Sequence, residues 1–276
     1  MVKGLYTAYT GMINEQHRMD VLTNNLANAN TNGYKKEGAT AQSFSDQLAL
    51  KIKDWTDAPH VARGIGDITP GVKIGEGYVD WSEGPMKETG NTFDLAIGGS
   101  GFFAIDYTNK AVNIERDLPN IQSIMYTRDG NFTLNSEGVL MTQDGDYVLS
   151  ADGSLIELDP NLKVEIAMNG NIIQDGEVVN TIGIFDFEKT IYPDGRYTYN
   201  NLEHYGENMY YPIDGVTATA GTGSVYAGFL EQSNVSVVDE MVNMIAVQRN
   251  YDTNQRMITT IDDTLEIAVQ QLGRLS

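Results

Sequence analysis

The sequence predicts an α+β protein in which long N- and C-terminal helices pack as a coiled-coil-like layer, joined to a β-rich central domain of hairpins. Apolar residues recur every seven positions near both ends of the 276-residue chain, a pattern typical of helices that pack along other helices. Six Asp-Gly pairs punctuate the middle, and this dipeptide between short apolar runs favours β-hairpins. No long helical pattern interrupts the middle, so a βαβ sheet is not expected.

The first predicted element is a helix within an N-terminal segment of residues 1–34. One apolar stripe repeats every seven residues, and an offset stripe follows it by three residues, interrupted at Glu15. A single helix lying on a sheet would give a similar pattern, so this end alone leaves coiled-coil packing open. The residues of the two stripes are Leu5, Ala8, Met12, Met19, Leu22 and Leu26.

This helix is followed by "NNLANANTNGYK", residues 24–35, in which five of the twelve residues are asparagine. Asparagine side chains compete for backbone hydrogen bonds, so Asn24, Asn25 and Asn28 weaken the last turns of the helix. The Thr-Asn-Gly sequence that follows predicts a turn with a positive φ angle at Gly33.

Residues 35–92 are predicted to form an extended linker with short strands between the helical layer and the β domain. The Gly-rich run 62–85 contains several strand candidates, and residues 44–52 are a candidate for a short helix.

Residues 93–228 are predicted to form the β-rich domain. Short runs with alternating, β-branched or aromatic content lie between turn signals, and residues 126–158 have the pattern of a meander of four or five strands. The Asp-Gly pairs begin at Asp129, Asp144, Asp152, Asp175, Asp194 and Asp214.

The C-terminal segment 229–276 is predicted to be one long helix. Neither Gly nor Pro occurs in residues 236–270, and a helix of this length would span ~50 Å. A long helix lying across its own domain is the alternative to a paired one. Neither terminal seam can be buried alone, so the N-terminal helix is expected to order only on a partner. The seam consists of Val237, Met244, Val247, Tyr251, Ile258, Ile261, Leu265, Ala268 and Leu272, with Glu240 and Asn254 as polar members.

Composition excludes several classes of function. A net charge of −20 argues against binding to nucleic acid or to an anionic membrane surface, both of which need concentrated Lys and Arg. The chain has no cysteine, which removes disulfides, thiol catalysis and thiolate metal sites. The N-terminal residues lack the apolar run of a cleavable signal peptide, and no apolar run is long enough for a membrane-spanning helix.

Motifs for catalysis, cofactors or metals are not expected to be functional. Gly99-Ser100-Gly101 fits a dinucleotide-binding pattern in its letters, but a strand-like run follows it where a helix N-terminus is required. The residues "DGNFTLNSEG" do not fit the ligand positions of a calcium loop. His17, His60 and His204 lack zinc-type spacing. We therefore predict no catalytic, cofactor or metal site.

Four blocks of the chain, in order, resemble the flagellar rod and hook proteins of bacteria. They are residues 5–35, 90–105, 126–149 and 228–265, and Asn14-Glu15 departs from the Ala-Gln that the family often has. The matching N-terminal positions are Leu5, Ala8, Thr10, Gly11, Met12, Asp20, Asn24, Asn25, Ala27, Asn28, Thr31, Gly33, Tyr34 and Lys35. The matching C-terminal positions are Glu231, Ser233, Asn234, Val235, Glu240, Met244, Ile245, Gln248, Arg249 and Tyr251.

The resemblance implies a structural axial subunit of the flagellar basal body, not an enzyme. Such subunits leave the cell through the flagellar export apparatus without a cleaved signal. They polymerise helically with themselves and with other rod and hook proteins, inside bushing rings that surround the rod. The chain length and the single β region favour the distal rod type, with the proximal rod type as the alternative. The asparagine cluster is then interpreted as an assembly joint, where the chain leaves the inner helix.

The main alternative from another class is a β-rich module that binds cell-wall glycans and carries a helical oligomerisation stalk. Clustered exposed aromatic residues would favour it, although strand packing explains the same residues. The cluster consists of Tyr192, Tyr197, Tyr199, Tyr205, Tyr210 and Tyr211.

Overall fold

The computed structural model describes residues 2–51, 63–107, 124–191, 197–206, 208–213 and 215–273. By its internal contacts, the chain divides into two compact units. We call residues 1–27, 37–79 and 236–276 the helical unit, and residues 28–36 and 80–235 the β unit. The domain boundaries expected from the sequence, at residues 34, 92 and 228, stay a prediction.

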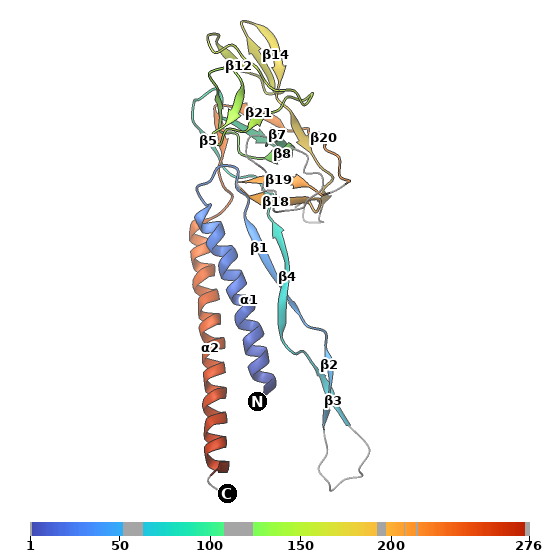
Figure 1. Cartoon of the computed structure of the whole chain (residues 1–276), viewed down its shortest axis with the longest axis vertical. Coiled ribbons are helices and arrows are strands. Elements are labelled where there is room, and N and C mark those ends of the chain that lie inside the picture. The colour runs from blue at the N-terminus through green and yellow to red at the C-terminus, as the bar shows by residue number, and fades with distance from the viewer. Residues whose placement is uncertain are drawn as a thin grey trace. The chain divides into compact units, whose positions relative to one another are not determined.

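The helical unit contains the two terminal helices, α1 (Val2–Ala27) and α2 (Val237–Gly273). They lie side by side and antiparallel, so that the N-terminal end of α1 and the C-terminal end of α2 are at the same end of the pair (Figure 1). Ser236 caps the start of α2: its hydroxyl oxygen accepts a hydrogen bond of 3.5 Å from the Asp239 amide, and its carbonyl accepts the Glu240 amide at 3.0 Å. The predicted fold class, with paired terminal helices and a β-rich middle, is confirmed.

The rest of the helical unit is a pair of two-stranded ribbons. Strand β1 (Glu37–Ser43) pairs with β4 (Val72–Val79), and β2 (Gln47–Lys51) pairs with β3 (Arg63–Ile68), both antiparallel. Helix α1 also contacts β1 and β4. The prediction of a short helix over residues 44–52 is wrong, because Gln47–Lys51 forms β2. The backbone groups of β2 hydrogen-bond to β3 instead of to one another within a helix, so strand pairing overrides local helix propensity.

The β unit is built around one nine-stranded sheet with the order β18-β19-β8-β7-β11-β10-β9, in which β15 also pairs with β7 and β20 with β15. Beside it are the sheet β12-β13-β14 and the pairs β21-β6, β22-β5 and β16-β17. The bounds of the first half are β5 (Met86–Glu88), β6 (Leu95–Gly98), β7 (Phe102–Asp106), β8 (Ile124–Thr127), β9 (Phe132–Leu134), β10 (Leu140–Thr142), β11 (Tyr147–Val148), β12 (Val164–Ile166) and β13 (Asn171–Gln174). Those of the second half are β14 (Glu177–Thr181), β15 (Ile184–Asp186), β16 (Thr190–Ile191), β17 (Tyr197–Thr198), β18 (Leu202–Gly206), β19 (Met209–Pro212), β20 (Thr219–Ala220), β21 (Ser224–Ala227) and β22 (Phe229–Glu231).

The predicted meander is only partly correct. Strands β9, β10 and β11 follow one another as neighbours, but β7 lies between β11 and β8. A local turn signal cannot reveal that an earlier strand inserts between two later ones, because that pairing is non-local.

The Asp-Gly pairs differ in what they do. Asp175-Gly176 has positive φ at both residues and joins β13 to β14, as a two-residue hairpin turn requires. Asp129-Gly130 makes no hairpin: a Cβ on Gly130 would lie 1.7 Å from the Leu95 carbonyl oxygen, so glycine is needed there for close packing. The pair at Asp194 lies outside the described residues.

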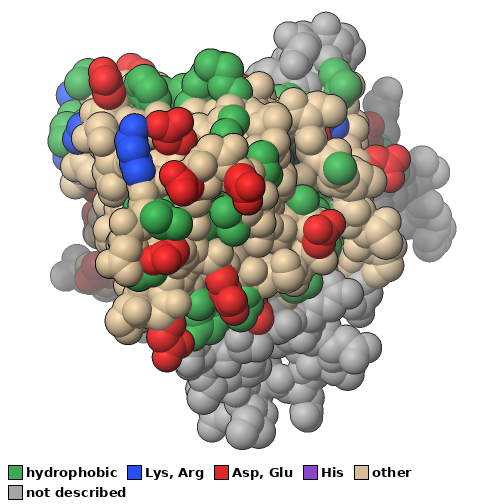
Figure 2. Space-filling model, turned by 90° about the horizontal axis from the view of Figure 1, so that it is seen from above, with side chains coloured by type: hydrophobic (Ala, Val, Ile, Leu, Met, Phe, Trp, Pro, Cys, Tyr) green, Lys and Arg blue, Asp and Glu red, His purple; other side chains and the backbone are tan. Residues whose placement is uncertain are grey.

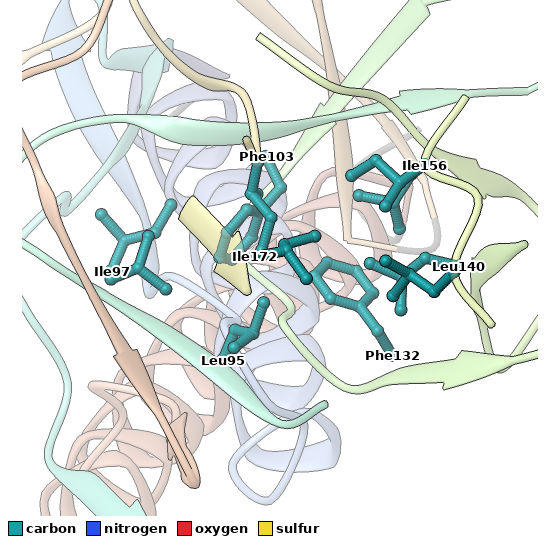
Figure 3. Packing of buried hydrophobic residues seen from close by; sticks show 11 residues of the cluster. Leu95, Ile97, Phe103, Phe132, Leu140, Ile156 and Ile172 are labelled. Atoms are coloured by element: carbon teal, nitrogen blue, oxygen red, sulfur yellow. The ribbon is translucent and has the colours of Figure 1, made fainter. Parts of the chain in front are cut away.

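One apolar cluster forms the main core of the β unit (Figure 3). Phe103 and Phe132 meet edge-to-face with ring centroids 5.1 Å apart. A second, aromatic cluster surrounds Trp81, which contacts the rings of Phe102 and Tyr199. The main cluster consists of Leu95, Ile97, Phe103, Phe132, Leu140, Val148, Ile156, Leu158, Ile172, Ile182 and Val225.

Candidate assembly interface and its joint

The two terminal helices are in a fixed antiparallel register. A Cβ on Gly4 would lie 3.6 Å from Ile261, and a Cβ on Gly11 would lie 3.0 Å from Asn254. Near the other end of α1, the Asn25 amide nitrogen lies 3.3 Å from a Glu240 carboxylate oxygen. As the residue number rises along α1, the number of the facing residue on α2 therefore falls by the same amount.

The α1 side of this contact is made of small residues. Gly4 and Gly11 let the helices approach closely, and Ala8 between them is buried. The heptad series starting at Leu5 lies one residue away from these glycines, so the stripe of large residues predicted the helix pairing but not its closest contacts. The signal that could have found them is the Gly4, Ala8, Gly11 spacing, since small residues permit close backbone approach.

The predicted seam residues occupy covered positions of their helices. On α2, Val247 is 1% exposed, whereas Val237 at the helix start is exposed and the Leu272 side chain lies outside the described residues. Half-buried positions on α2 are Met244, Tyr251, Ile258, Ile261, Leu265 and Ala268. Half-buried positions on α1 are Leu5, Met12, Met19, Leu22 and Leu26.

Asn25 holds the beginning of β1 against the end of α1. Its side-chain oxygen accepts the Glu37 amide at 2.9 Å, and its side-chain nitrogen donates to the Glu37 carbonyl at 2.7 Å. Because the same nitrogen also reaches Glu240, this buried side chain links α1, β1 and α2 within the helical unit. Asn24 is exposed, and the half-buried Asn28 binds Thr31 in the turn that follows α1.

Gly33 packs inside the β unit. Its φ of 65° is the positive value expected from the sequence. Its amide donates to the Glu231 carbonyl at 2.8 Å, and a Cβ would lie 2.6 Å from the Arg128 backbone. The turn therefore needs glycine both for its conformation and for this close approach.

Next to Gly33, one buried carboxylate faces two buried cations. The Glu231 carboxylate lies 2.5 Å from the Lys35 ammonium and 3.3 Å from the Arg128 guanidinium, and the Lys35 and Glu231 side chains are each 1% exposed. Burial lowers the pKa of Lys35, and Glu231 opposes that shift. Sequence reasoning named Lys35 and Glu231 only as matching positions and missed Arg128, because nothing local marks residues so far apart as partners.

Backbone groups bind several of the remaining polar atoms of this network, whereas the buried Arg128 Nε has no hydrogen-bond partner among the described residues. Lys35 donates to the Ser82 carbonyl at 2.8 Å, and Arg128 donates to the Gly99 carbonyl at 2.8 Å. The Gly84 amide donates to Glu231 at 3.0 Å. Buried ion pairs are stable when such hydrogen bonds satisfy their remaining donors and acceptors.

Asn234 secures the same region just before α2. Its side-chain oxygen accepts the Lys36 amide at 2.7 Å, and its nitrogen donates to the Asp80 carbonyl at 2.8 Å. Within the β unit, the segment after α1 and the segment before α2 are therefore held by both charge and hydrogen bonds.

The carboxyl group of Asp129 lies in a part of the β unit that disfavours its ionised form. Burial, with Asp144 and Asp94 nearby, raises the pKa of its carboxyl group to about 6, while the Asn131 amide donates to it and opposes the shift. In the ionised form, this group destabilises the fold.

The motifs considered for other chemistry have structural roles. Gly99 and Gly101 have positive φ in the turn between β6 and β7, where a strand follows, so the helix N-terminus of a nucleotide site is missing. His17 lies on α1 and His204 on β18, whereas His60 lies outside the described residues. Among the described residues, no group of three or more acidic, His or Cys side chains is placed to hold a metal ion.

The described tyrosines of the cluster pack against other aromatic rings of the β unit. Tyr199 and Tyr210 are buried against Trp81, and Tyr199 donates a hydrogen bond of 2.6 Å to Asp186. Tyr205 and Tyr211 meet edge-to-face. Tyr192 lies outside the described residues. The buried Tyr199 and Tyr210 cannot stack on a sugar ring, whereas Tyr197, Tyr205 and Tyr211 are half-buried, so the support for a glycan-binding surface is weakened here.

Both terminal helices also expose apolar side chains away from their mutual contact. On α1 these are Tyr6, Tyr9 and Ile13. On α2 they are Val238, Met241, Val242 and Ile245, the first 70% and the third 60% exposed. The face seen in Figure 2 carries hydrophobic and acidic side chains interspersed among other polar ones, with few basic side chains. The exposed apolar residues of the helices form two separate groups, near the start of α1 and near the start of α2, and exposed apolar patches of this kind are typical of protein interaction sites.

Family models match three parts of the chain. Residues 5–35 match the model described as flagella basal body rod protein, and residues 96–180 match the flagellar hook protein FlgE/F/G D1 domain. Residues 226–271 match the flagellar basal body rod FlgEFG protein C-terminal model. The matched ends contain the helix pair and its joint.

Curated relatives are similar over the whole chain. The flagellar basal-body rod protein FlgG of Bacillus subtilis is 34% identical, with 96% of this chain and 97% of the relative covered. The flagellar basal-body rod protein FlgF of Mesorhizobium japonicum is 30% identical over all of both chains. The flagellar hook-basal body complex protein FlhO of Bacillus subtilis is 28% identical, again over all of both chains.

Replacing Glu231 by Gln should lower the free energy of unfolding of the β unit by about 3–5 kcal/mol, because Lys35 and Arg128 would be left buried without a counter-charge. Urea unfolding followed by tryptophan fluorescence measures this. The control is Glu165→Gln in the exposed Lys163–Glu165 pair, where solvent screens the charges and we expect no measurable change. Equal effects of the two substitutions would contradict a structural role for the buried network.

Replacing Asp129 by Asn should make the protein more stable at pH 7.5 by roughly 2–3 kcal/mol, given a shift of about two pKa units. The folded-state pKa is raised, so the folded protein binds more protons than the unfolded chain between pH 3.8 and about 6, and stability falls as pH rises through this window. The advantage of the variant should therefore vanish toward pH 4. Asp152→Asn, at an exposed position, should show no such pH dependence.

Replacing Ile258 by Asp should separate the terminal helices, at a cost of about 2 kcal/mol, because it places an unpaired charge on the half-buried seam of α2. Helical circular dichroism and polymer formation are the two readouts. Thr259→Asp puts the same charge on the exposed neighbouring position and should leave both unchanged. If the two variants behaved alike, the seam would not be the contact surface.

Proposed function

Since the chain belongs to the flagellar basal-body rod protein family, we propose that it is an axial subunit of the rod that polymerises helically and transmits motor torque to the hook. A location in the flagellar basal body is supported by these relatives. The family is a structural component of the rod, and we propose that this chain has no catalytic activity of its own.

The observation that supports polymerisation best is the incomplete burial of the paired terminal helices. In the described part of α2, most seam residues are only half-buried, and apolar side chains face outward on both helices. Burying such side chains between copies supplies favourable free energy, roughly 25 cal/mol per Å² of apolar surface. A contact that joins α1 of one copy to α2 of the next would be heterologous, and it would continue as a helical polymer if the rotation between copies does not close a ring.

The sites of assembly are the seam residues together with the joint at Asn24, Asn25, Asn28 and Gly33. The partners are further copies of this chain, other rod and hook proteins, the flagellar export apparatus and the bushing rings. The rod crosses the periplasm and cell wall, and the chain reaches it without a cleaved signal peptide. Among the described residues, none of the helices combines the length and apolarity that a bilayer span requires.

We favour the distal rod type over the proximal one. The relatives include FlgG proteins, the distal type, at up to 34% identity, and FlgF proteins, the proximal type, at 30%. The small difference makes the proximal type the alternative within the same family. The run "IERDLPNIQ", residues 114–122, comes before the third matching block and resembles an insertion relative to the family; it lies outside the described residues.

The exposed stripe on α2 provides the test of the proposed function. Replacing Val242 and Ile245 by Ser should leave the unfolding free energy of the monomer within about 0.5 kcal/mol, since both side chains are exposed, but should abolish polymerisation. Electron microscopy of the purified protein and swimming of cells that make only the variant are the measurements.

The matched control is Val178→Ser with Val179→Ser, which removes two exposed valine side chains of the β unit. This variant should polymerise and support swimming. Full assembly and motility of the Val242→Ser, Ile245→Ser protein would contradict the proposed role of the terminal helices.

A further inference from the structure

The C-terminal turns of α2 extend past the end of α1. Gly4 lies opposite Ile261 in an antiparallel pair, so the first residue of α1 is level with about residue 264 of α2. The segment Leu265–Gly273, which we call the overhang, has no α1 residue opposite it. It carries the half-buried seam residue Leu265 and, one turn further on, the apolar Val269, which is 68% exposed. The seam that pairs the two helices therefore continues onto an uncovered surface.

A groove opens on another face of α1 in the same helical unit. Lys3, Tyr6 and Thr7 form one wall, and the opposite wall comes from β2, β3 and the turn into β4. Its volume is about 280 Å³, and the Thr7 hydroxyl donates to the Pro70 carbonyl at 3.3 Å at its edge. The wall opposite α1 consists of Gln47, Leu48, Ile68, Thr69 and Pro70.

The groove suits aliphatic side chains rather than a cofactor. Pockets for small ligands usually enclose roughly 300–1,000 Å³ and carry several convergent polar groups, whereas here Lys3 is the one charged lining residue. Leu48 is 64% and Tyr6 is 53% exposed, so the groove is open to a partner. Its apolar walls suit a few apolar side chains of a partner, and Lys3 suits an acidic group beside them.

The overhang has this chemistry. Glu266 lies within it, Asp262 and Asp263 lie just before it, and residues 257–273 contain no Lys or Arg. The chain's own overhang cannot turn back into the groove, because α2 is an uninterrupted helix held to the Gly4 face of α1, while Lys3 and Thr7 lie on a different face. The overhang of a second copy is free of this constraint.

We propose that the groove between α1 and the β2–β3 ribbon receives the α2 overhang of a second copy of this chain, with Leu265 and Val269 in the groove and Glu266 near Lys3. This inference rests on the proposed function. Each copy offers one groove and one overhang, so the contact repeats from copy to copy and leaves a free groove at one end of the polymer and a free overhang at the other. It names the segments through which the terminal helices join neighbouring copies.

The absence of native cysteine allows a direct test by disulfide cross-linking. Full-length chains carrying Leu48→Cys are mixed with chains carrying Val269→Cys, polymerised, and oxidised with copper phenanthroline. A disulfide forms only when the two Cα atoms come within about 7 Å. We expect most of the protein to shift to a disulfide-linked dimer on a non-reducing gel. Both positions are exposed, so neither substitution should disturb folding.

The matched control pairs Val269→Cys with Val178→Cys, an exposed valine of the β unit, and should leave the chains monomeric on the gel. Polymers that form without the Leu48–Val269 dimer would overturn this inference while leaving the proposed function standing. If the Leu48→Cys chain formed disulfides only with another rod protein that carries an added cysteine, and not with the Val269→Cys chain, the choice of a second copy as the occupant would be overturned. Failure of all mixtures to polymerise would overturn both the inference and the proposed function.

Discussion

The structure of the β unit depends on one carboxylate. Glu231 neutralises Lys35 and Arg128 where water cannot, and the three residues come from segments that are distant in the sequence. Removing a charge from water costs several kcal/mol, so the cations are tolerated only when the carboxylate is in place. The segments after α1 and before α2 must therefore both be docked before this part of the β unit is stable. Asn234 and Gly33 reinforce the same region through backbone groups.

The helical unit has the opposite character. Its buried polar contacts concentrate at Asn25 and Glu240, near the end of α1, while most of the α1–α2 seam is only half-buried. Two helices side by side cover one stripe of each other and leave the other faces in water. The exposed apolar stripe of α2, the overhang and the groove beside α1 are all uncovered surfaces of this kind. A chain with a complete β unit and an incomplete helical unit has the properties needed for a subunit of a continuous polymer.

The sequence predicted the features that local patterns determine. The heptads located both helices, the absence of Gly and Pro gave the length of α2, and Gly33 was correctly expected to have positive φ. Non-local features escaped prediction: the insertion of β7 between β8 and β11, the strand at residues 47–51, and the ion network, whose members are separated by about a hundred residues or more. Deleting residues 1–35 would also remove Lys35 from the β unit, so a truncation meant to isolate that unit should end at Ala27.

The central claim is that the β unit is complete in one chain and the helical unit is completed by neighbouring copies. Hydrogen–deuterium exchange on the free chain and on the polymer tests this claim most directly. The account predicts that amides of the β7 and β8 strands are protected in both states, whereas amides of α2 exchange quickly in the free chain and slowly in the polymer. Equal protection of α2 in the two states would contradict it.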